Sequence, residues 1–440
     1  MPLNTLKRFF EQYGNAYTYW IAYSGGMDSH VLLSLASMLR STHLISLRAI
    51  YINHQLHPDA SRWGEHCQLV CDNLNIPLTI KNIDLDLTAG ESIEALAREK
   101  RYAVFVNLLA KDDILLTAHH QNDQAETVLI QLLRGAGPKG LAAMPFIKSF
   151  GSGQHARPLL HLSRDVLHQY AISHHLKWIE DPSNLDQRFV RNFVRHEIMP
   201  KLIAYTKGSL STIVRSAAHC AETDALLNSF ASSLLNTVKG SLPETLSVSR
   251  ILMLDDATER LILRSFIHSL GLQVPDAKKL EVIQREILRA RGDRNPVLCW
   301  RGVVIRRYRD DLYVLPASDR SNSLKDSEWY LKEPLWIQGV GRLLIRASLG
   351  KGFALAIDRV QIRFRQGGEK LYLKNRGHRT LKNLFQEWGI PPWERDRTPI
   401  FFLNGQCIGV LGYGLDEKYL VKANEVGQEP YLEPVRITRN

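Results

Sequence analysis

Cysteine is scarce in this chain, with 5 residues among 440. Cys67 and Cys71 are four positions apart and form no Cys-x-x-Cys pair, while Cys220, Cys299 and Cys407 stand alone. Disulfide frameworks and cysteine metal sites need closely spaced or paired cysteines. We therefore expect neither, and a reducing compartment such as the cytoplasm fits this usage best.

Long apolar runs are missing as well. No stretch approaches the roughly 18 uninterrupted apolar residues of a membrane-spanning helix. The N-terminal residues 1–12 carry Lys7 and Arg8 but no apolar segment of the kind that a signal peptide contains. We expect a cytoplasmic protein that has no membrane partner.

Acidic residues are fewer than basic residues. The chain has 45 Asp and Glu and 56 Lys and Arg, which gives a formal net charge of +11. An excess of this size favours a polyanionic partner such as a nucleic acid. A basic enzyme that acts only on small molecules would have the same composition. The length predicts two to four domains.

The most informative segment is a glycine loop without the Walker A lysine, because no lysine follows Gly26. Residues 17–23 predict a strand and residues 31–39 have helical spacing. The loop between them consists of Ser24, Gly25, Gly26, Met27, Asp28 and Ser29. A tight glycine turn at a helix N-terminus binds phosphate through free N–H groups, and the Asp28 carboxylate suits Mg²⁺. The simpler alternative is an ordinary turn.

Strand-like and helix-like runs alternate through the first two hundred residues. Strands are expected at 47–52, 77–80 and 114–118, and helices at 61–74, at 91–110 and from about 122. This order predicts an α/β fold with a doubly wound parallel sheet, which binds ligands at the carboxyl ends of its strands. Ser24, His54 and His119 all fall at predicted strand ends, so we expect them at one crevice.

The pattern changes beyond residue 201. We predict a catalytic domain at 1–205, a mainly helical domain at 206–318 and a small α/β domain at 327–440, with a polar linker between the last two. The middle domain has strand-like runs at 296–300, 303–307 and 312–315. The last domain has one helix near 379–388, with strand-like runs at 343–347, 354–357, 361–364, 400–402 and 408–411.

A second candidate segment is residues 117–127, which leave a strand and enter a helix. Asp123 and Glu126 are three residues apart and share one helical face. Two carboxylates beside a phosphate site require a cation, either Mg²⁺ or an ammonium-bearing substrate. Acidic residues that only complement the helix dipole are the alternative.

Several arginine and lysine pairs are candidate anion contacts. Arg98 and Arg101 share one helical face and suit phosphate oxygens, although ion pairs with Glu94 explain them equally well. Further cations lie in the glycine loop 134–141 and on the segment 191–195. These are Arg134, Lys139, Arg191 and Arg195. They suit RNA or phosphate, while a simple turn remains an alternative for the glycine loop.

The clearest basic stripe lies near the C-terminus. Within residues 370–382, which contain no Asp or Glu, are Lys370, Lys374, Arg376, Arg379 and Lys382. Phe385, Trp388 and Trp393 follow closely. Basic residues interleaved with aromatics suit an RNA surface, and a solvated cationic face is the alternative.

These segments, in this order, resemble the bacterial tRNA(Ile)-lysidine synthetases, a family of PP-loop ATP pyrophosphatases. The resemblance is strong over about residues 20–200 and extends to the basic stripe and the Pro391-Pro392-Trp393 turn. It rests on Ser24–Ser29, His54, Glu94–Tyr102, His119–Thr127, Arg134–Leu141, Arg157–Leu160, Trp178–Asn184 (which we expect to end a strand) and Arg191–Arg195.

The resemblance implies a two-step reaction on the wobble cytidine of tRNA(Ile) with a CAU anticodon. The cytosine O2 first attacks the α-phosphate of ATP and releases pyrophosphate. The ε-amine of free L-lysine then attacks carbon 2 and AMP leaves. The family also suggests a homodimer.

The resemblance assigns roles to residues. The loop Ser24–Ser29, with His54 and His119, would bind ATP, and Asp28 would hold Mg²⁺. Arg98 would assist at the phosphates, while Asp123 and Glu126 would bind lysine. The remaining cations, Arg134, Lys139, Arg191, Arg195 and the basic stripe, would contact tRNA.

Two other functions remain open from the sequence. A tRNA 2-thiolation enzyme of the same superfamily would use catalytic cysteines or an iron–sulfur cluster, and paired cysteines are missing here. A non-catalytic tRNA-binding protein would not need Asp28 or the Asp123/Glu126 pair.

Overall fold

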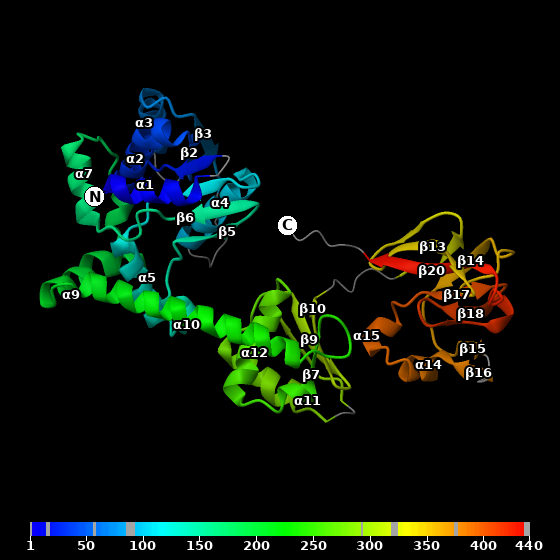
Figure 1. Cartoon of the computed structure of the whole chain (residues 1–440). Helices are drawn as coiled ribbons and strands as arrows, with labels where there is room; N and C mark the ends of the chain where they lie inside the picture. The colour runs from blue at the N-terminus through cyan, green and yellow to red at the C-terminus, as the bar shows by residue number, and fades with distance from the viewer. Residues whose placement is uncertain are drawn as a thin grey trace. The chain divides into compact units, whose positions relative to one another are not determined.

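The computed structural model describes residues 2–14, 18–55, 59–84, 93–291, 294–317, 324–373 and 377–434. The chain forms two compact units, Met1–Phe230 and Ala231–Asn440, and each is considered by itself (Figure 1). The finer division into three domains stays a prediction.

A six-stranded sheet with the order β3-β2-β1-β4-β6-β5 organises the first unit. Its neighbouring strands are parallel, except for the antiparallel pair β5–β6. The strands are β1 (Tyr19–Ala22), β2 (Leu47–Asn53), β3 (Leu78–Asn82), β4 (Ile114–Leu116), β5 (Ile147–Phe150) and β6 (Gly153–Ala156). The predicted doubly wound parallel sheet is confirmed.

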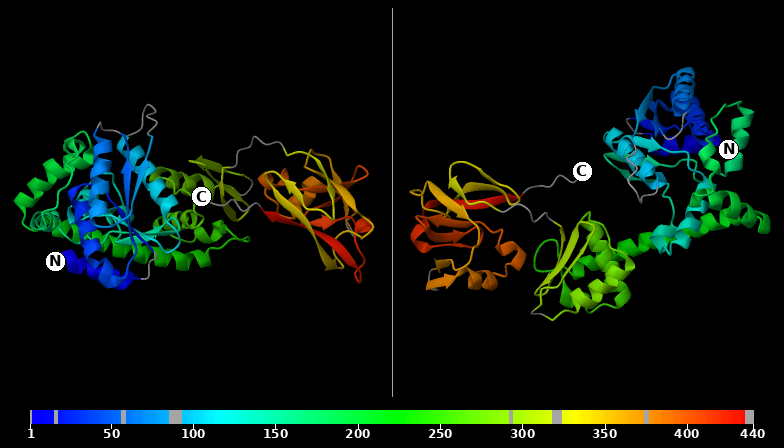
Figure 2. Two further views of the ribbon diagram at one scale, coloured as in Figure 1. Left: turned by 90° about the horizontal axis from the view of Figure 1, so that it is seen from above. Right: turned by 180° about the vertical axis from the view of Figure 1, so that it is seen from behind.

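Helices cover both faces of this sheet (Figure 2). Because side chains alternate along β1, Tyr19 and Ile21 pack with α1, α2, α3 and α7, whereas Trp20 packs with Phe105 of α4. The helical segments are α1 (Pro2–Tyr13), α2 (Met27–His43), α3 (Ala60–Asn73), α4 (Ile93–Leu108), α5 (Gln121–Leu133), α6 (Pro138–Leu141), α7 (Arg164–Ser173), η1 (Pro182–Leu185), α8 (Val190–Phe193), η2 (Val194–Ile198), α9 (Met199–Tyr205) and α10 (Ser209–Thr237).

The strand order creates a crevice between β1 and β4. From β1 the chain adds β2 and β3 on one side, and then returns to place β4 on the other side of β1. The loops that leave β1 and β4 therefore diverge, and a doubly wound sheet binds ligands at such a switch point. The loop Ser24–Ser29 and the segment His119–Asp123 begin there.

The helical segment at residues 190–205 continues through a π-helical turn, η2. Val194 of η2 and Met199 of α9 are buried in one cluster with Ala125 of α5. This packing holds the α8–η2 segment against α5, so its polar side chains meet those of α5. π-Helical turns are rare and are frequent at functional sites.

One predicted strand in the first unit does not form. The segment Trp178–Asn184, which was expected to end a strand, belongs to no sheet. The N–H of Ile179 instead donates to the carbonyl of Gly25 at 2.9 Å. This hydrogen bond ties the segment to the glycine loop.

The second unit begins with helices packed on a four-stranded antiparallel sheet of order β7-β10-β9-β8. Its elements are β7 (Thr245–Ser247), α11 (Val248–Ile251), α12 (Asp256–Ser269), α13 (Ala277–Val282), η3 (Ile283–Leu288), β8 (Val297–Trp300), β9 (Val303–Tyr308) and β10 (Asp311–Pro316). The predicted helices are accompanied by the three predicted strands and by β7.

The rest of the second unit is mostly antiparallel β structure, in sheets of order β11-β14-β17-β18-β19 and β12-β13-β20 and a β15–β16 hairpin. Its elements are β11 (Ser327–Tyr330), β12 (Leu335–Ile337), β13 (Gly341–Leu349), β14 (Arg359–Arg363), β15 (Lys370–Leu373), β16 (Gly377–Thr380), α14 (Leu381–Glu387), α15 (Pro392–Arg395), β17 (Ile400–Leu403), β18 (Gln406–Val410), β19 (Gly414–Leu415), η4 (Glu417–Tyr419) and β20 (Val426–Pro434).

Two details of this region differ from the sequence prediction. Residues 354–357 form a turn rather than a strand, because the N–H of Ile357 donates to the carbonyl of Ala354 at 3.0 Å. The helix begins at Leu381, so Arg379 lies on strand β16. Among the described residues, none of the helices is long and apolar enough to cross a membrane.

Candidate active site

The glycine loop between β1 and α2 is held in one shape by its own serines. The Ser29 hydroxyl donates to the carbonyl of Gly26 at 2.9 Å and accepts the N–H of Ser24 at 3.2 Å. Gly25 has a φ of +79°, and an added Cβ would lie 2.6 Å from Cδ1 of Ile179. Only glycine fits this position without strain.

The loop ends in the open N-terminus of α2. Gly26 is the N-cap residue and supplies no side chain to cap the helix. The N–H groups of the first turn therefore have no intrahelical acceptor, and they point toward the carboxyl edge of the sheet. Such N–H groups bind phosphate oxygens, and the helix dipole adds to the attraction.

Asp28 lies in this first turn and connects α2 to α5. Its Oδ2 is 3.5 Å from Nε2 of His120, and its Oδ1 is buried without a hydrogen-bond partner among the described residues. His120 is only 1% exposed and caps α5 through Nδ1, which accepts the N–H of Asp123. Burial lowers the pKa of His120, but Asp28 and Asp123 outweigh burial and leave that pKa above its usual value.

Asp123 and Glu126 are each bound by two arginines. Arg191 donates from Nη2 to Asp123 at 2.8 Å and from Nε to Glu126 at 3.0 Å. Arg195 donates from Nη2 to Asp123 at 2.9 Å. It also donates to Glu126 from Nε at 2.7 Å and from Nη2 at 3.0 Å. We call these four residues the charge quartet. The two carboxylates share one helical face, as predicted from the sequence, whereas their arginine partners were not predicted.

The charge quartet has no net charge when both carboxylates are ionised. Burial raises the pKa of Asp123, but interactions with His120, Arg191, His119 and Arg195 outweigh burial and hold that pKa well below its usual range. Burial lowers the pKa of Arg195, and its hydrogen bond to Glu126 reverses the direction and raises it. Each carboxylate is paired with both guanidinium groups, so the two negative and two positive charges of the quartet balance.

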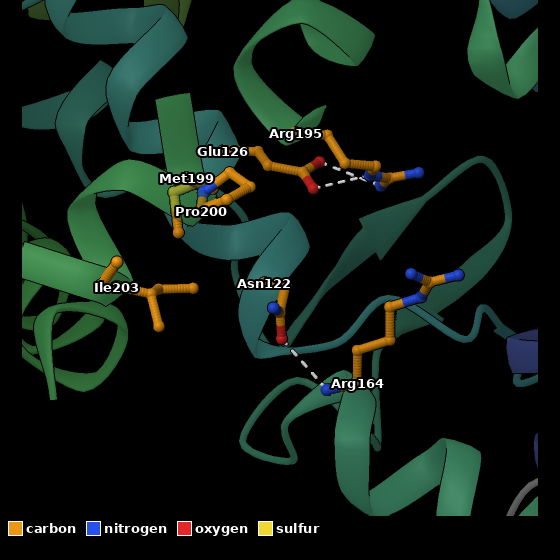
Figure 3. Close-up of a pocket in the computed structure, with 8 residues that line it drawn as sticks. Asn122, Glu126, Arg164, Arg195, Met199, Pro200 and Ile203 are labelled. Carbon is orange, nitrogen blue, oxygen red and sulfur yellow. Dashed lines mark hydrogen bonds and ion pairs between the residues drawn. The ribbon is translucent and has the colours of Figure 1, made fainter. Parts of the chain in front are cut away.

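A cavity of about 400 Å³ lies beside the charge quartet (Figure 3). Glu126 and Arg195 line one side of it, and Asn122 and Arg164 line another. Met199 and its neighbours on α9 add an apolar wall. Among the described residues the Arg164 guanidinium forms no ion pair, whereas its backbone N–H is bound by Asn122 at 3.0 Å. Cavities of this size hold small ligands.

Cations gather on the α4 side of the crevice. Arg101 donates to Nε2 of His54 at 3.1 and 2.9 Å, so His54 anchors an arginine. Burial, followed by the charge of Arg101, lowers the pKa of His54 to about 4. Arg98 is exposed and its guanidinium lies 5.0 Å from the centre of the Tyr102 ring. His119 is neutral, because burial lowers its pKa to about 3.

Arg157 is a residue to which the sequence analysis assigned no role. It directly follows β6, it is 3% exposed, and its Nε is buried without a partner. It donates to the carbonyl of Pro145 at 2.7 Å and to Nδ1 of His155 at 3.2 Å. Burial lowers the pKa of Arg157. The position after a strand was the available signal, but β6 was not predicted.

Other predicted site residues belong to elements that do not form this crevice. Arg134 is the exposed C-cap of α5, at the end away from His120, and Lys139 is exposed on α6. Lys370, Arg379 and Lys382 are exposed in the second unit. Two further predicted tRNA contacts, Lys374 and Arg376, lie outside the described residues.

Comparisons with known proteins agree with this geometry. Residues 3–202 match the PP-loop domain model, residues 246–313 the TilS substrate binding domain and residues 360–430 the TilS substrate C-terminal domain. A relative from Coxiella burnetii named tRNA(Ile)-lysidine synthase is 42% identical over 418 residues, which is 94% of this chain and 93% of the relative. The chain belongs to the tRNA(Ile)-lysidine synthase family.

A second member of the tRNA(Ile)-lysidine synthase family, from Methylococcus capsulatus, is 42% identical over 90% of this chain and 91% of its own length. A third, from Alkalilimnicola ehrlichii, is 38% identical over 95% of this chain and 94% of its own. The family predicted from the motifs is therefore confirmed.

Replacing Gly25 tests the role of the loop shape. We expect Gly25→Ala to lower the rate of ATP turnover by at least about tenfold, because the added methyl group clashes with Ile179 and the positive φ is strained. Gly302→Ala is the control, since Gly302 also has a positive φ, of +76°, but has no atoms within 4 Å of an added Cβ. Equal activity of both variants in a pyrophosphate-release assay would contradict this view.

Acid should destabilise the first unit through its buried neutral histidines. Burial, followed by the charge of Arg157, lowers the pKa of His155 to about 2. The unfolded chain binds a proton there near pH 6.5 and the folded chain does not, so stability is lost as the pH falls below about 6.5.

The histidine variant His155→Gln isolates this effect. Its unfolding free energy should depend less steeply on pH between about pH 5.5 and 4, by about one proton or about 1.4 kcal/mol per pH unit. Thermal melts across this range measure the slope. An unchanged slope would mean that His155 is already protonated in the folded protein.

Proposed function

We propose that this protein ligates free lysine to carbon 2 of the wobble cytidine of a CAU-anticodon tRNA(Ile), with ATP as the activating substrate. The observation that carries the proposal is the meeting of the open α2 N-terminus, Asp28 and the charge quartet at the switch point of the sheet. In this reaction the cytosine O2 displaces pyrophosphate from ATP. The lysine ε-amine then displaces AMP and loses a proton as the C–N bond forms.

The loop Ser24–Ser29 would hold the phosphates of ATP. The first-turn N–H groups of α2 face the developing negative charge of the leaving pyrophosphate and stabilise it. Arg98 and His119 would contribute donors from the neighbouring elements. His54 would act indirectly, since its Nε2 is already engaged by Arg101.

Asp28 fits a magnesium site. Its Oδ1 is buried and has no protein partner in the described part of the chain. No group of three or more potential ligands occurs among the described residues, so Mg²⁺ would need oxygens from the nucleotide. This matches the usual mode of Mg²⁺, which binds through one or two carboxylates and substrate phosphates. Bound there, the ion would neutralise phosphate charge.

Lysine would occupy the cavity beside the charge quartet. Oε1 of Glu126 has one hydrogen bond, from Arg195, and so retains room to accept another from an ammonium group. The apolar wall of α9 suits the alkyl chain, and the Arg164 guanidinium suits the α-carboxylate. Because the quartet is neutral, lysine would be selected by shape and hydrogen bonds more than by net charge.

The main role of Arg191 and Arg195 would be to support this pocket, since both hold the carboxylates of α5. Contact with RNA would be a secondary role. The tRNA itself would contact the exposed cations of both units, among them Arg134, Lys139, Lys370, Arg379 and Lys382. We propose a cytoplasmic location, where tRNA and ATP occur together. The family resemblance also suggests a homodimer, which sedimentation would test.

The cysteines give no support to a thiolation reaction. All five are free, and Cys67 and Cys71 are fully buried on α3. Burial raises the pKa of each of these two thiols to about 12, so neither supplies a thiolate at neutral pH. Cys67 instead packs against Gly25 of the loop.

Lysine dependence is the decisive test of the proposed reaction. AMP release in the presence of ATP, Mg²⁺ and cognate tRNA should require lysine, and nucleoside analysis of the tRNA should show lysidine. The control is tRNA(Met), which has the same anticodon and should not react. Equal AMP release without lysine would contradict the assignment.

A substitution of Asp28 distinguishes the function of an enzyme from that of a non-catalytic tRNA-binding protein. We expect Asp28→Asn to lower ATP turnover by about 100-fold or more, while tRNA affinity changes by less than about threefold. Asp72→Asn is the control, because Asp72 is exposed at the end of α3 and its carboxylate accepts a hydrogen bond from the Gln68 side chain. Full activity of Asp28→Asn would exclude the proposed role of its carboxylate.

A further inference from the structure

A chain of hydrogen bonds runs behind the active crevice, through residues that the proposed reaction does not use directly. The Thr117 hydroxyl lies 2.8 Å from Nδ1 of His119 and 2.9 Å from Nε2 of His155. Arg157 continues the chain, with its Nη2 at 3.2 Å from Nδ1 of His155. Thr117, His155 and Arg157 are 7%, 0% and 3% exposed, so water does not compete for these bonds.

The arginine fixes the direction of the first two bonds in this chain. A guanidinium only donates, so Nδ1 of His155 must accept. The proton of the neutral ring is then on Nε2 and is donated to the Thr117 oxygen. The hydroxyl proton of Thr117 is therefore free to be donated to Nδ1 of His119.

Both histidines are in the neutral form that this order requires. Burial lowers the pKa of His155 to about 2 and that of His119 to about 3. Arg157, Arg191 and Arg98 add to this effect at His119, and the Asp123 carboxylate opposes it. When the Thr117 hydroxyl donates to Nδ1, neutral His119 carries its single proton on Nε2, an atom that has no hydrogen-bond partner among the described residues.

We propose that Thr117, His155 and Arg157 are positioning residues that fix the tautomer of His119, so that its Nε2–H is a hydrogen-bond donor to an oxygen of the bound nucleotide. The proposal rests on the proposed function only for the identity of that nucleotide, ATP or the activated cytidine. Because His119 lies in the loop that follows β4, and β4 pairs with β1, it lies at the same switch point as the glycine loop.

This arrangement decides between two roles for His119. A ring that accepts at Nε2 could act as a general base, whereas a ring that donates from Nε2 can only stabilise negative charge on a substrate oxygen. A neutral imidazole donor is effective in this task because its proton stays on the ring. We therefore assign stabilisation of charge to His119 and exclude proton abstraction by Nε2.

The first test is spectroscopic and needs no substrate. In protein labelled with ¹⁵N-histidine, long-range ¹H–¹⁵N correlations report which ring nitrogen carries the proton, and His119→Gln identifies the signals of His119. We expect the Nε2–H tautomer in the wild-type protein and a mixture of tautomers in Thr117→Val. The Nδ1–H tautomer in the wild-type protein would overturn the proposal.

The second test is kinetic. Thr117→Val should lower kcat by about tenfold while KM for ATP changes by less than about threefold, because a donor that acts on developing charge matters most in the transition state. Thr117→Ser keeps the hydroxyl and should restore most of the rate. Thr42→Val removes a hydroxyl that bonds the carbonyl of Leu39 on the exposed end of α2, and it should have no effect.

The outcomes separate the proposal from simple destabilisation and from the proposed function. If Thr117→Ser is as slow as Thr117→Val, or if Thr117→Val retains full kcat, the positioning role is wrong. If the tautomers behave as expected but the wild-type protein makes no lysidine, the proposed function fails and the positioning of His119 stands.

Discussion

Pairing of buried charge at the charge quartet is the constraint on which the rest of the site depends. Asp123 and Glu126 are almost fully buried on α5, and an unpaired carboxylate there would cost several kcal/mol. Arg191 and Arg195 remove that cost and tie the segment 190–205 to α5. His120 extends the same set of contacts to Asp28 on α2.

The parallel sheet explains why these contacts occur where they do. The order β3-β2-β1-β4 brings the loop after β1 and the helix after β4 to one edge, although they are about a hundred residues apart in sequence. The electrostatic properties of these two elements differ, and both suit the binding of a nucleotide. The α2 N-terminus attracts phosphates, while the neutral quartet beside it neither repels a nucleotide nor captures a counterion.

Much of the catalytic unit could be predicted from local signals. The glycine loop, the strand before it and the Asp123/Glu126 face each depend on spacing within a few residues, and each was found. Strand β6 was not predicted, and the segment around Ile179 was wrongly predicted to end a strand. The conformations of both depend on partners distant in sequence. Residues 354–357 were also wrongly predicted as a strand, because the hydrophobic pattern of this turn resembles that of a strand.

The sequence alone determined the family, the doubly wound fold, and the residue types that we propose bind phosphate and a cation. These properties are encoded in short motifs and in hydrophobic periodicity. Only the tertiary structure decided that Arg191 and Arg195 neutralise Asp123 and Glu126, and that Arg157 reaches His119 through His155 and Thr117. The physical reason is that an ion pair or a hydrogen bond depends on distances of about 3 Å between side chains, which only the packing of separate elements sets.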